Sequence, residues 1–194
     1  MRRFLDRLYL WSGWLAAGFI AAICALVFAQ VMLNLIDRLS TLLRGEAFGL
    51  TIPSYGDFTG FFLAAASFLA LAHTMREGGH IRVSLILQML PARARHMADL
   101  WGVGLAALVS LYFSWYMADL IRESFIYNDL SPGMIATPIW IPQSALLLGL
   151  VILSISLLDD LVGLLRGGKA SFSGKGESLL EGRDTMPASI LDGE

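Results

Sequence analysis

Residues 76–83, Arg-Glu-Gly-Gly-His-Ile-Arg-Val, lie almost at the middle of the chain and organise the segments around them. Three charged side chains, a histidine and a glycine pair fall within residues 76–82, between long apolar segments. Adjacent glycines adopt backbone conformations that other residues avoid, so they let a chain leave a helix and turn sharply. Charged side chains are costly in hydrocarbon, which predicts that this turn lies at a membrane surface, although a generic polar loop between two membrane helices has a similar composition. We expect the residues of this turn to have a structural role or to contact a partner or lipid. These residues are Arg76, Glu77, Gly78, Gly79, His80 and Arg82.

Two apolar runs precede the turn and two follow it. Residues 8–36 carry no charge, and this run is longer than the ~20 residues that a helix needs to cross hydrocarbon. It is also too long for a typical cleaved signal peptide, which predicts an uncleaved first span. We therefore predict an all-α integral membrane protein with four transmembrane helices. The predicted spans are residues 8–33, 55–75, 98–118 and 141–158, within a four-helix membrane domain of residues 1–165.

A shorter apolar segment, residues 81–90, follows the turn and is too short to span a membrane. We predict a short interfacial helix here, between the second and third spans, with Ser84 near its start and Pro91 at its end. After the fourth span the composition shifts to Gly, Ser, Lys and Glu, which offer little to bury. Residues 166–194 are therefore predicted to form a flexible tail.

The composition of the whole chain favours a membrane protein. Of its 194 residues 56% are hydrophobic and only 15% are charged, and the mean hydropathy is +0.66, whereas a soluble domain is nearer a quarter charged. No basic patch with interleaved aromatic residues is present, so nucleic-acid binding has no support. The single cysteine, Cys24, lies in an apolar run and cannot form an internal disulfide.

The amino-acid sequence of the central stretch also resembles that of a known family. Residues 76–83, followed about ten residues later by Leu90-Pro91 and then by Arg93 and Arg95, resemble the DctQ-like small membrane subunit of TRAP transporters (tripartite ATP-independent periplasmic transporters). The family often has an acidic residue where this chain has Ser84, which brings no charge to that position. The resemblance implies two partners, a large TRAP membrane subunit and a periplasmic substrate-binding protein. It also implies sodium-coupled uptake of a small organic acid across a bacterial inner membrane.

The distribution of basic residues predicts the topology. The N-terminus, the central turn and the tail fall on one side of a four-span chain and contain eleven Lys and Arg, against three on the other side. Because the basic-rich side is cytoplasmic, both termini are predicted to be cytoplasmic. The connections of residues 37–57 and 119–139 then face outward. Their charged residues are candidates for periplasmic docking of the substrate-binding protein, namely Arg44, Glu46 and Arg122.

The sequence offers little chemistry of its own. No P-loop is present, and the spans lack the charged residues expected of an ion route. Of the three histidines only His73 lies within a span, so a haem-binding redox anchor is a weak alternative, and we expect no cofactor. A second alternative is the small subunit of a tricarboxylate-type importer, which shares the four-span size but not the central motif. Most of the polar residues within the spans are expected to make helix–helix contacts. These polar residues include Gln30, Asn34, Ser67, Ser110, Ser114, Ser144, Ser154 and Ser156.

Overall fold

The computed structural model describes residues 2–46, 48–76 and 91–167. Within these residues the chain forms four α-helices and no β-strand. All four helices are long and apolar enough to cross a membrane, which confirms the predicted fold class. The predicted interfacial helix of residues 81–90 and residues 168–194 of the predicted tail lie outside the described residues. The helices are α1 (Arg2–Arg44), α2 (Tyr55–Arg76), α4 (Ala92–Ile126) and α5 (Trp140–Leu165).

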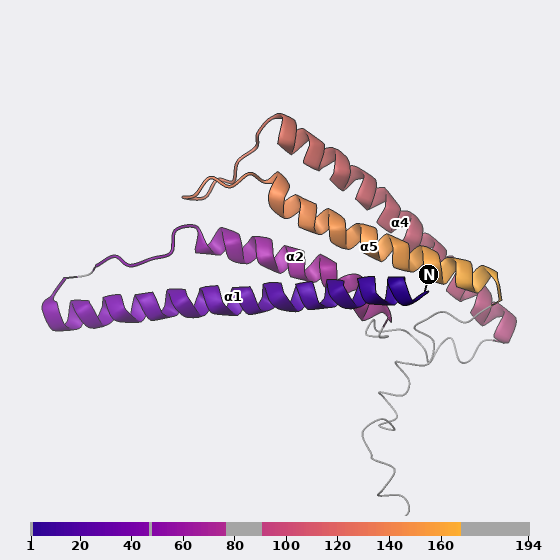
Figure 1. Ribbon diagram of the computed structural model, residues 1–194, viewed down its shortest axis with the longest axis horizontal. Helices are drawn as coiled ribbons and strands as arrows, with labels where there is room; N and C mark the ends of the chain where they lie inside the picture. The colour runs from indigo at the N-terminus through magenta and orange to yellow at the C-terminus, as the bar shows by residue number, and fades with distance from the viewer. Residues whose placement is uncertain (1, 47, 77–90, 168–194) are drawn as a thin grey trace, which may run out of the picture.

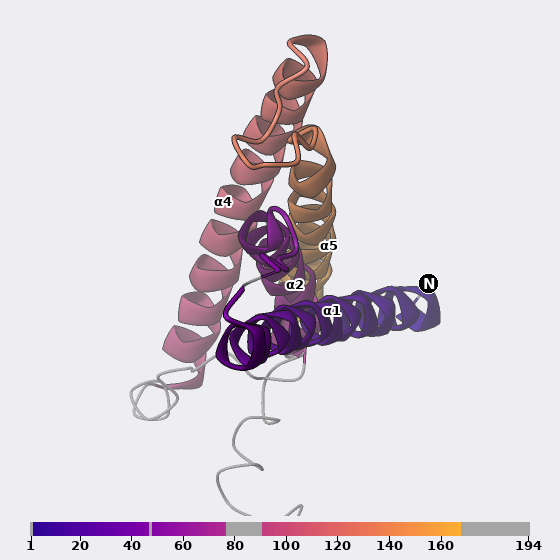
Figure 2. The ribbon, with the colours of Figure 1, turned by 90° about the vertical axis from the view of Figure 1, so that its left-hand side faces the viewer.

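The helices form two antiparallel pairs that are joined through α2 and α5 (Figure 1). One pair is α1 with α2, and the other is α4 with α5. We call the end where α1 and α4 begin and α2 and α5 finish the Arg76 end, and the opposite end the far end. The pairs approach each other at the Arg76 end, and α1 is inclined steeply to α4 and α5 (Figure 2). The last turns of α1 extend past the start of α2 (Figure 1).

The buried residues form two small clusters that match this arrangement. The first cluster joins α1, α2 and α5, and the second joins α4 to α5. Many of the buried residues are alanines and serines, which allow helix backbones to approach closely in a membrane protein. The first cluster contains Tyr9, Ala16, Leu69, Ala72 and Ile152, and the second contains Val103, Ala107, Leu157 and Leu164.

Two glycines mark the closest helix crossings. A Cβ atom added to Gly149 on α5 would lie 2.5 Å from the backbone carbonyl carbon of Phe68 on α2. A Cβ atom added to Gly13 on α1 would lie 2.9 Å from the imidazole ring of His73 on α2. Neither distance leaves room for a larger residue, so glycine sets how closely α2 packs against both neighbours.

The helices continue beyond the predicted spans: α1 and α4 include residues 37–44 and 119–126 of the expected polar connections, and α5 continues to Leu165, past the predicted span end at residue 158. Charged residues do not end a helix when they can reach water, so α1, α4 and α5 keep their hydrogen bonding past them. The helices end at residues with positive φ, which close a helix from the left-handed region. Gly45 (φ 78°) follows α1, Asn128 (φ 52°) follows the cap of α4, and Gly167 (φ 77°) follows the cap of α5.

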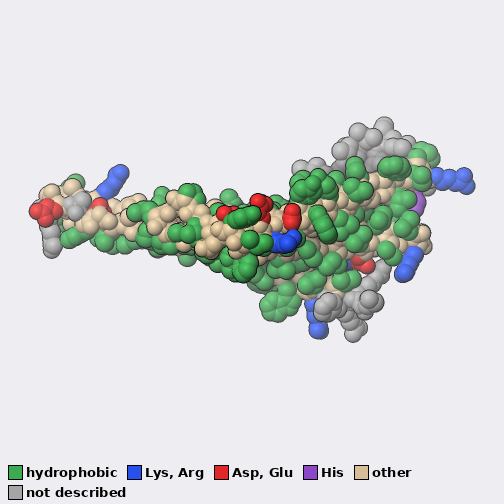
Figure 3. All heavy atoms as spheres, turned by 90° about the horizontal axis from the view of Figure 1, so that it is seen from above, with side chains coloured by type: hydrophobic (Ala, Val, Ile, Leu, Met, Phe, Trp, Pro, Cys, Tyr) green, Lys and Arg blue, Asp and Glu red, His purple; other side chains and the backbone are tan. Residues whose placement is uncertain are grey.

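Hydrophobic side chains are exposed along the length of the face seen in Figure 3, and exposed large hydrophobic residues occur on all four helices. The exposed large residues include Trp14 and Phe28 on α1 and Trp101 and Trp115 on α4. A surface of this kind is not stable in water and must be covered by lipid chains or by apolar helices of a partner. The 43 residues of α1 measure about 64 Å, roughly twice the thickness of hydrocarbon, so α1 must tilt or project from the membrane.

Candidate functional site

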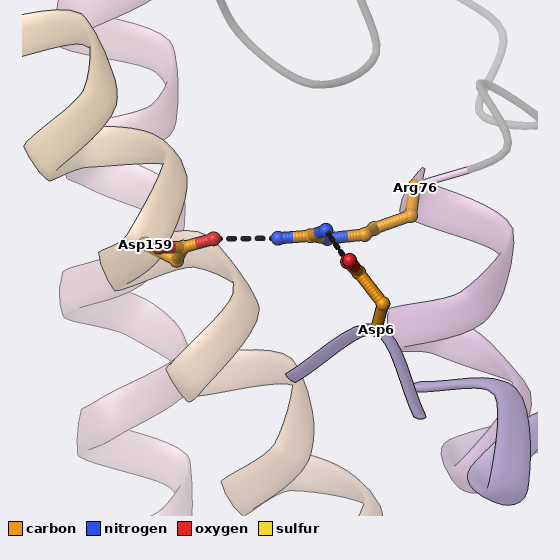
Figure 4. Close-up of polar contacts among 3 residues, drawn as sticks. All are labelled: Asp6, Arg76 and Asp159. Carbon is orange, nitrogen blue, oxygen red and sulfur yellow. Dashed lines mark hydrogen bonds and ion pairs between the residues drawn. The ribbon is translucent and has the colours of Figure 1, made fainter. Parts of the chain in front are cut away.

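Arg76 lies where the central sequence motif meets the folded bundle. It is the last residue of α2 and the first residue of the quoted stretch. Its guanidinium forms ion pairs with Asp6 on α1 and with Asp159 on α5, each with an N···O distance of 2.5 Å. Figure 4 shows the planar guanidinium between the two carboxylates, which come from different helices. One side chain therefore joins three of the four helices at this end.

The aromatic ring of Tyr9 lies beneath this arginine. The guanidinium carbon is 4.4 Å from the ring centroid, a cation–π contact that adds to the two ion pairs. Tyr9 is almost fully buried, as are Ser156 and Asp160 on α5. The hydroxyls of Tyr9 and Ser156 are buried, and neither forms a hydrogen bond with another described residue. We call these residues the Arg76 cluster: Asp6, Tyr9, Arg76, Ser156, Asp159 and Asp160.

The two ion pairs differ in how much water surrounds them. The side chain of Arg76 is 17% exposed, that of Asp159 is 33% exposed and that of Asp6 is 57% exposed. A solvated pair such as Arg76–Asp6 contributes about 1 kcal/mol or less. Breaking a more buried pair costs more, because it leaves a charge without compensation away from water. The ion pair Arg76–Asp159, which joins α2 to α5, is therefore the stronger of the two ion pairs.

The other residues predicted for the central motif lie outside the described residues. These are Glu77, Gly78, Gly79, His80 and Arg82. Arg76 is thus the one motif member whose contacts the structure gives. Sequence reasoning missed its partners Asp6 and Asp159, because they lie 70 and 83 residues away along the chain. No local pattern connects residues at such separations.

The predicted docking residues lie at the far end, on two separate surfaces. Arg44 is the last residue of α1, and the exposed Glu46 follows it, its backbone carbonyl accepting a hydrogen bond from Ser40. Arg122 is exposed in the last two turns of α4. The ends of α1 and α4 lie well apart in both ribbon views (Figures 1 and 2). The structure therefore does not bring Arg122 together with Arg44 and Glu46.

The connections at the far end are held by hydrogen bonds to the helices. The backbone N–H of Ile135 donates to the hydroxyl of Ser54 at 2.9 Å, and Gly133 packs against Ser54 and Asp57. The connection between α4 and α5 is thereby seated on the start of α2. The connection after α1 is held by Gln30, whose amide oxygen accepts from the N–H of Ile52 at 2.8 Å. Both connections have a defined place on the bundle.

Serine residues make the predicted helix–helix contact between α4 and α5. The hydroxyls of Ser110 and Ser154 are 2.8 Å apart, and that of Ser114 is 3.4 Å from Ser154. Gln30 is an exception, because it bonds to Asn34 on its own helix and to Thr51 and Ile52 in the following connection. The hydroxyls of Ser67 and Ser144 bond to carbonyls of their own helices.

His73 has a packing position at the crossing of α1 and α2. The helix that faces its ring contributes Gly13, not a second histidine. Among the described residues no group of three or more His, Cys, Asp or Glu side chains is arranged to hold a metal ion. The position of His73 gives no support to the haem alternative, because a haem held by two histidines needs the second one on a facing helix.

Comparison with known proteins identifies the family. The family described as Tripartite ATP-independent periplasmic transporters, DctQ component, matches residues 39–167, which include α2, α4, α5 and the central motif. A search of curated proteins and a search of solved structures each gave no match. The resemblance carried by the central motif is confirmed, and the family is a transporter component rather than an enzyme family. The chain therefore belongs to the DctQ component family of the tripartite ATP-independent periplasmic transporters, as a multi-pass membrane protein.

Proposed function

We propose that the chain is the small membrane subunit that braces the large transport subunit of a TRAP transporter. The complex would take up a small organic acid, driven by a sodium gradient, across a bacterial inner membrane. The large subunit carries the substrate through the membrane, and this chain widens and stiffens its stationary part.

The observation that carries this proposal is the Arg76 cluster. A guanidinium between Asp6 and Asp159 ties α1, α2 and α5 together at one end of the bundle. Serine hydroxyls tie α4 to α5 within the bundle. These polar groups are engaged with other parts of the same chain, as expected of a bracing element rather than of a pathway for ions or substrate.

The central motif has a structural role in this proposal. Gly78 and Gly79 allow the chain to turn after Arg76, and Glu77 pairs with Arg82 or with a basic residue of the large subunit. Arg82 meets lipid phosphates or carboxylates of the large subunit, and His80 lies with them at the cytoplasmic surface. We propose that residues 81–90 form a short helix along the same surface. The Lys and Arg distribution, eleven against three, supports a cytoplasmic position for this turn and for both termini.

The far end is proposed to receive the periplasmic substrate-binding protein. Arg44 and Glu46 provide one charged contact at the end of α1, and Arg122 provides another in the last two turns of α4. Their separation in the fold supports a docking mode that bridges α1 and α4 (Figure 1). Contacts of this kind weaken as salt is added, because exposed charges are screened.

Transport measures this function directly. In cells that express the large subunit and the substrate-binding protein, we expect sodium-dependent uptake of a small organic acid to require this chain. Reintroduction of the wild-type chain restores uptake, which controls for expression of the other components. Uptake that proceeds equally well without the chain contradicts the proposed function.

A further inference from the structure

The helix α4 has a row of exposed aromatic and leucine residues that faces away from the rest of the bundle. Positions three and four residues apart lie on one face of a helix. The residues of α4 that pack on α5 include Val103, Ala107 and Ser110, and the exposed row occupies the opposite side of the helix. We call this row the tyrosine face: Leu105, Leu108, Tyr112, Trp115 and Tyr116.

The polar tips of this face lie deep in the membrane. The charge-free part of α4 is residues 100–118, which measure about 28 Å, close to the hydrocarbon thickness of ~30 Å. The centre of this run is Val109, so Tyr112 is about 4.5 Å and Tyr116 about 10.5 Å from the middle of the membrane along the helix. Both tyrosines therefore lie within the hydrocarbon, whose edge is ~15 Å from the middle.

The direction of the side chains makes this depth greater. On an α-helix the Cα–Cβ bonds tilt toward the N-terminus, so both tyrosines reach back toward the middle of the membrane. They cannot extend to the headgroups at the far end of α4, as an aromatic residue of an interfacial belt does. The centroids of their rings lie 4.7 Å apart.

Lipid chains offer no hydrogen-bond acceptor for the hydroxyls of Tyr112 and Tyr116 or for the indole N–H of Trp115. Tyr112 is 56% exposed, Tyr116 is 57% exposed and Trp115 is 76% exposed, and no other described helix covers them. An exposed hydroxyl or indole N–H in hydrocarbon is unfavourable unless it is hydrogen-bonded. The occupant of this face must therefore supply hydrogen-bond acceptors at mid-membrane depth. A helix of another protein can do so, from side chains or from carbonyl groups.

We infer that the tyrosine face of α4 is the surface that docks on the large membrane subunit. This inference rests on the proposed function, because the family is a component of multipart transporters. Leu105 and Leu108 provide the apolar part of the contact. Tyr112, Trp115 and Tyr116 donate hydrogen bonds to acceptors of the large subunit within the bilayer.

The test is photo-crosslinking in native membranes that contain the whole transporter. A benzophenone amino acid replaces Tyr112 or Leu108, and the control replaces Leu63 on α2, which is apolar and 57% exposed near the middle of its span. We expect positions 112 and 108 to form adducts with a larger polytopic protein, and position 63 to form adducts with lipid.

Other outcomes overturn the inference in distinguishable ways. Adducts with lipid or with a second copy of this chain at positions 112 and 108, while the large subunit still copurifies, overturn the docking face and leave the proposed function standing. An adduct with the large subunit at position 63 but not at positions 112 and 108 also overturns the docking face and leaves the proposed function standing. Failure of the large subunit to copurify at all overturns the proposed function as well.

A conservative pair of variants tests the hydroxyls themselves. Tyr112→Phe and Tyr116→Phe keep the rings and remove the donors, and each is expected to lower recovery of the large subunit by about threefold in a detergent titration. Tyr127→Phe is the control, because Tyr127 caps α4 outside the charge-free run and is more exposed than either of the two tyrosines. Membrane insertion stays unchanged in all three. Unchanged recovery for both Tyr112→Phe and Tyr116→Phe contradicts the role assigned to the hydroxyls.

Discussion

A single guanidinium joins three helices at the Arg76 end of the bundle. Its planar fork of donors suits two carboxylates in different directions, which the compact ammonium of a lysine does not match. The ring of Tyr9 supports the face of the guanidinium, so part of the cation is shielded from water. The stability gained depends mainly on Asp159, because Asp6 is more exposed and its pairing is screened.

The first prediction concerns Arg76 and its two partners. Arg76→Ala removes both ion pairs and leaves Asp159 half-buried without its cation, so we expect a loss of about 1–3 kcal/mol in the free energy of unfolding. Asp6→Ala should cost about 0.5 kcal/mol, because this carboxylate is solvated. Unfolding of the purified chain in mild detergent measures both values. Equal losses for the two variants would contradict the unequal roles assigned to the carboxylates.

At the level of single residues, the sequence predicted Arg76 as a functional residue but did not predict the other members of the Arg76 cluster. Arg76 stood out because it is charged and begins a recognisable motif beside an apolar run. Asp6 lies in a short N-terminal segment with three arginines, and Asp159 directly follows the charge-free run of the fourth span. Their meeting with Arg76 depends on how three helices cross, and hydrophobic periodicity contains no information on such a crossing.

The positions of the four helices could be predicted from the charge-free runs of the sequence. Long charge-free runs located all four membrane helices, because a backbone in hydrocarbon must satisfy its own hydrogen bonds. The ends were not predictable from charge, since a helix continues into water until its backbone is diverted. In this chain Gly45, Asn128 and Gly167 divert it through positive φ angles. Glycine and asparagine at those positions were the better signal for helix ends.

The second prediction concerns the crossing of α2 and α5. Gly149→Ala places a methyl group against the backbone of Phe68, so α2 and α5 must separate, and we expect a loss of about 1–3 kcal/mol. Gly163→Ala on the same helix has open space around it and should be neutral or slightly stabilising. Thermal unfolding of the two variants in the same detergent makes the comparison. If both variants unfold alike, the close approach at Gly149 is not what positions the helices.

The molecule as a whole differs between its two ends. Its helices pack closely at the Arg76 end, while α1 diverges from the α4–α5 pair toward the far end (Figure 1). The Arg76 end is also the basic-rich side of the sequence. In the proposed assembly the close-packed end faces the cytoplasm, and the open end meets the periplasmic substrate-binding protein.

The third prediction concerns this orientation. A reporter enzyme that is active only in the cytoplasm, fused after Glu194, should be active, and the same reporter inserted after Gly133 in the connection between α4 and α5 should be inactive. The two fusions control each other, since both must be present at similar levels in the membrane. The opposite pattern would place the Arg76 end outside the cytoplasm.

The fourth prediction concerns docking at the far end. Charge reversal at Arg44 and Glu46, or separately at Arg122, should reduce uptake at low salt several-fold and reduce its dependence on salt. Because the two surfaces are separate, the combined variant should show the product of the two effects. Reversal of Arg166 at the Arg76 end is the control, and it should leave the salt dependence unchanged. If uptake and its salt dependence stay unchanged in all the far-end charge-reversal variants, docking at these residues is contradicted.

The most direct measurement of the central claim is purification of the complex from native membranes. The chain carries an affinity tag after Glu194, the membranes are extracted in mild detergent, and the copurifying proteins are identified and quantified by mass spectrometry. We predict equimolar recovery of a polytopic membrane protein two to three times larger, in keeping with a multipart transporter. Recovery of the chain alone, or with redox proteins, would contradict the account of this chain as the bracing subunit of a transporter.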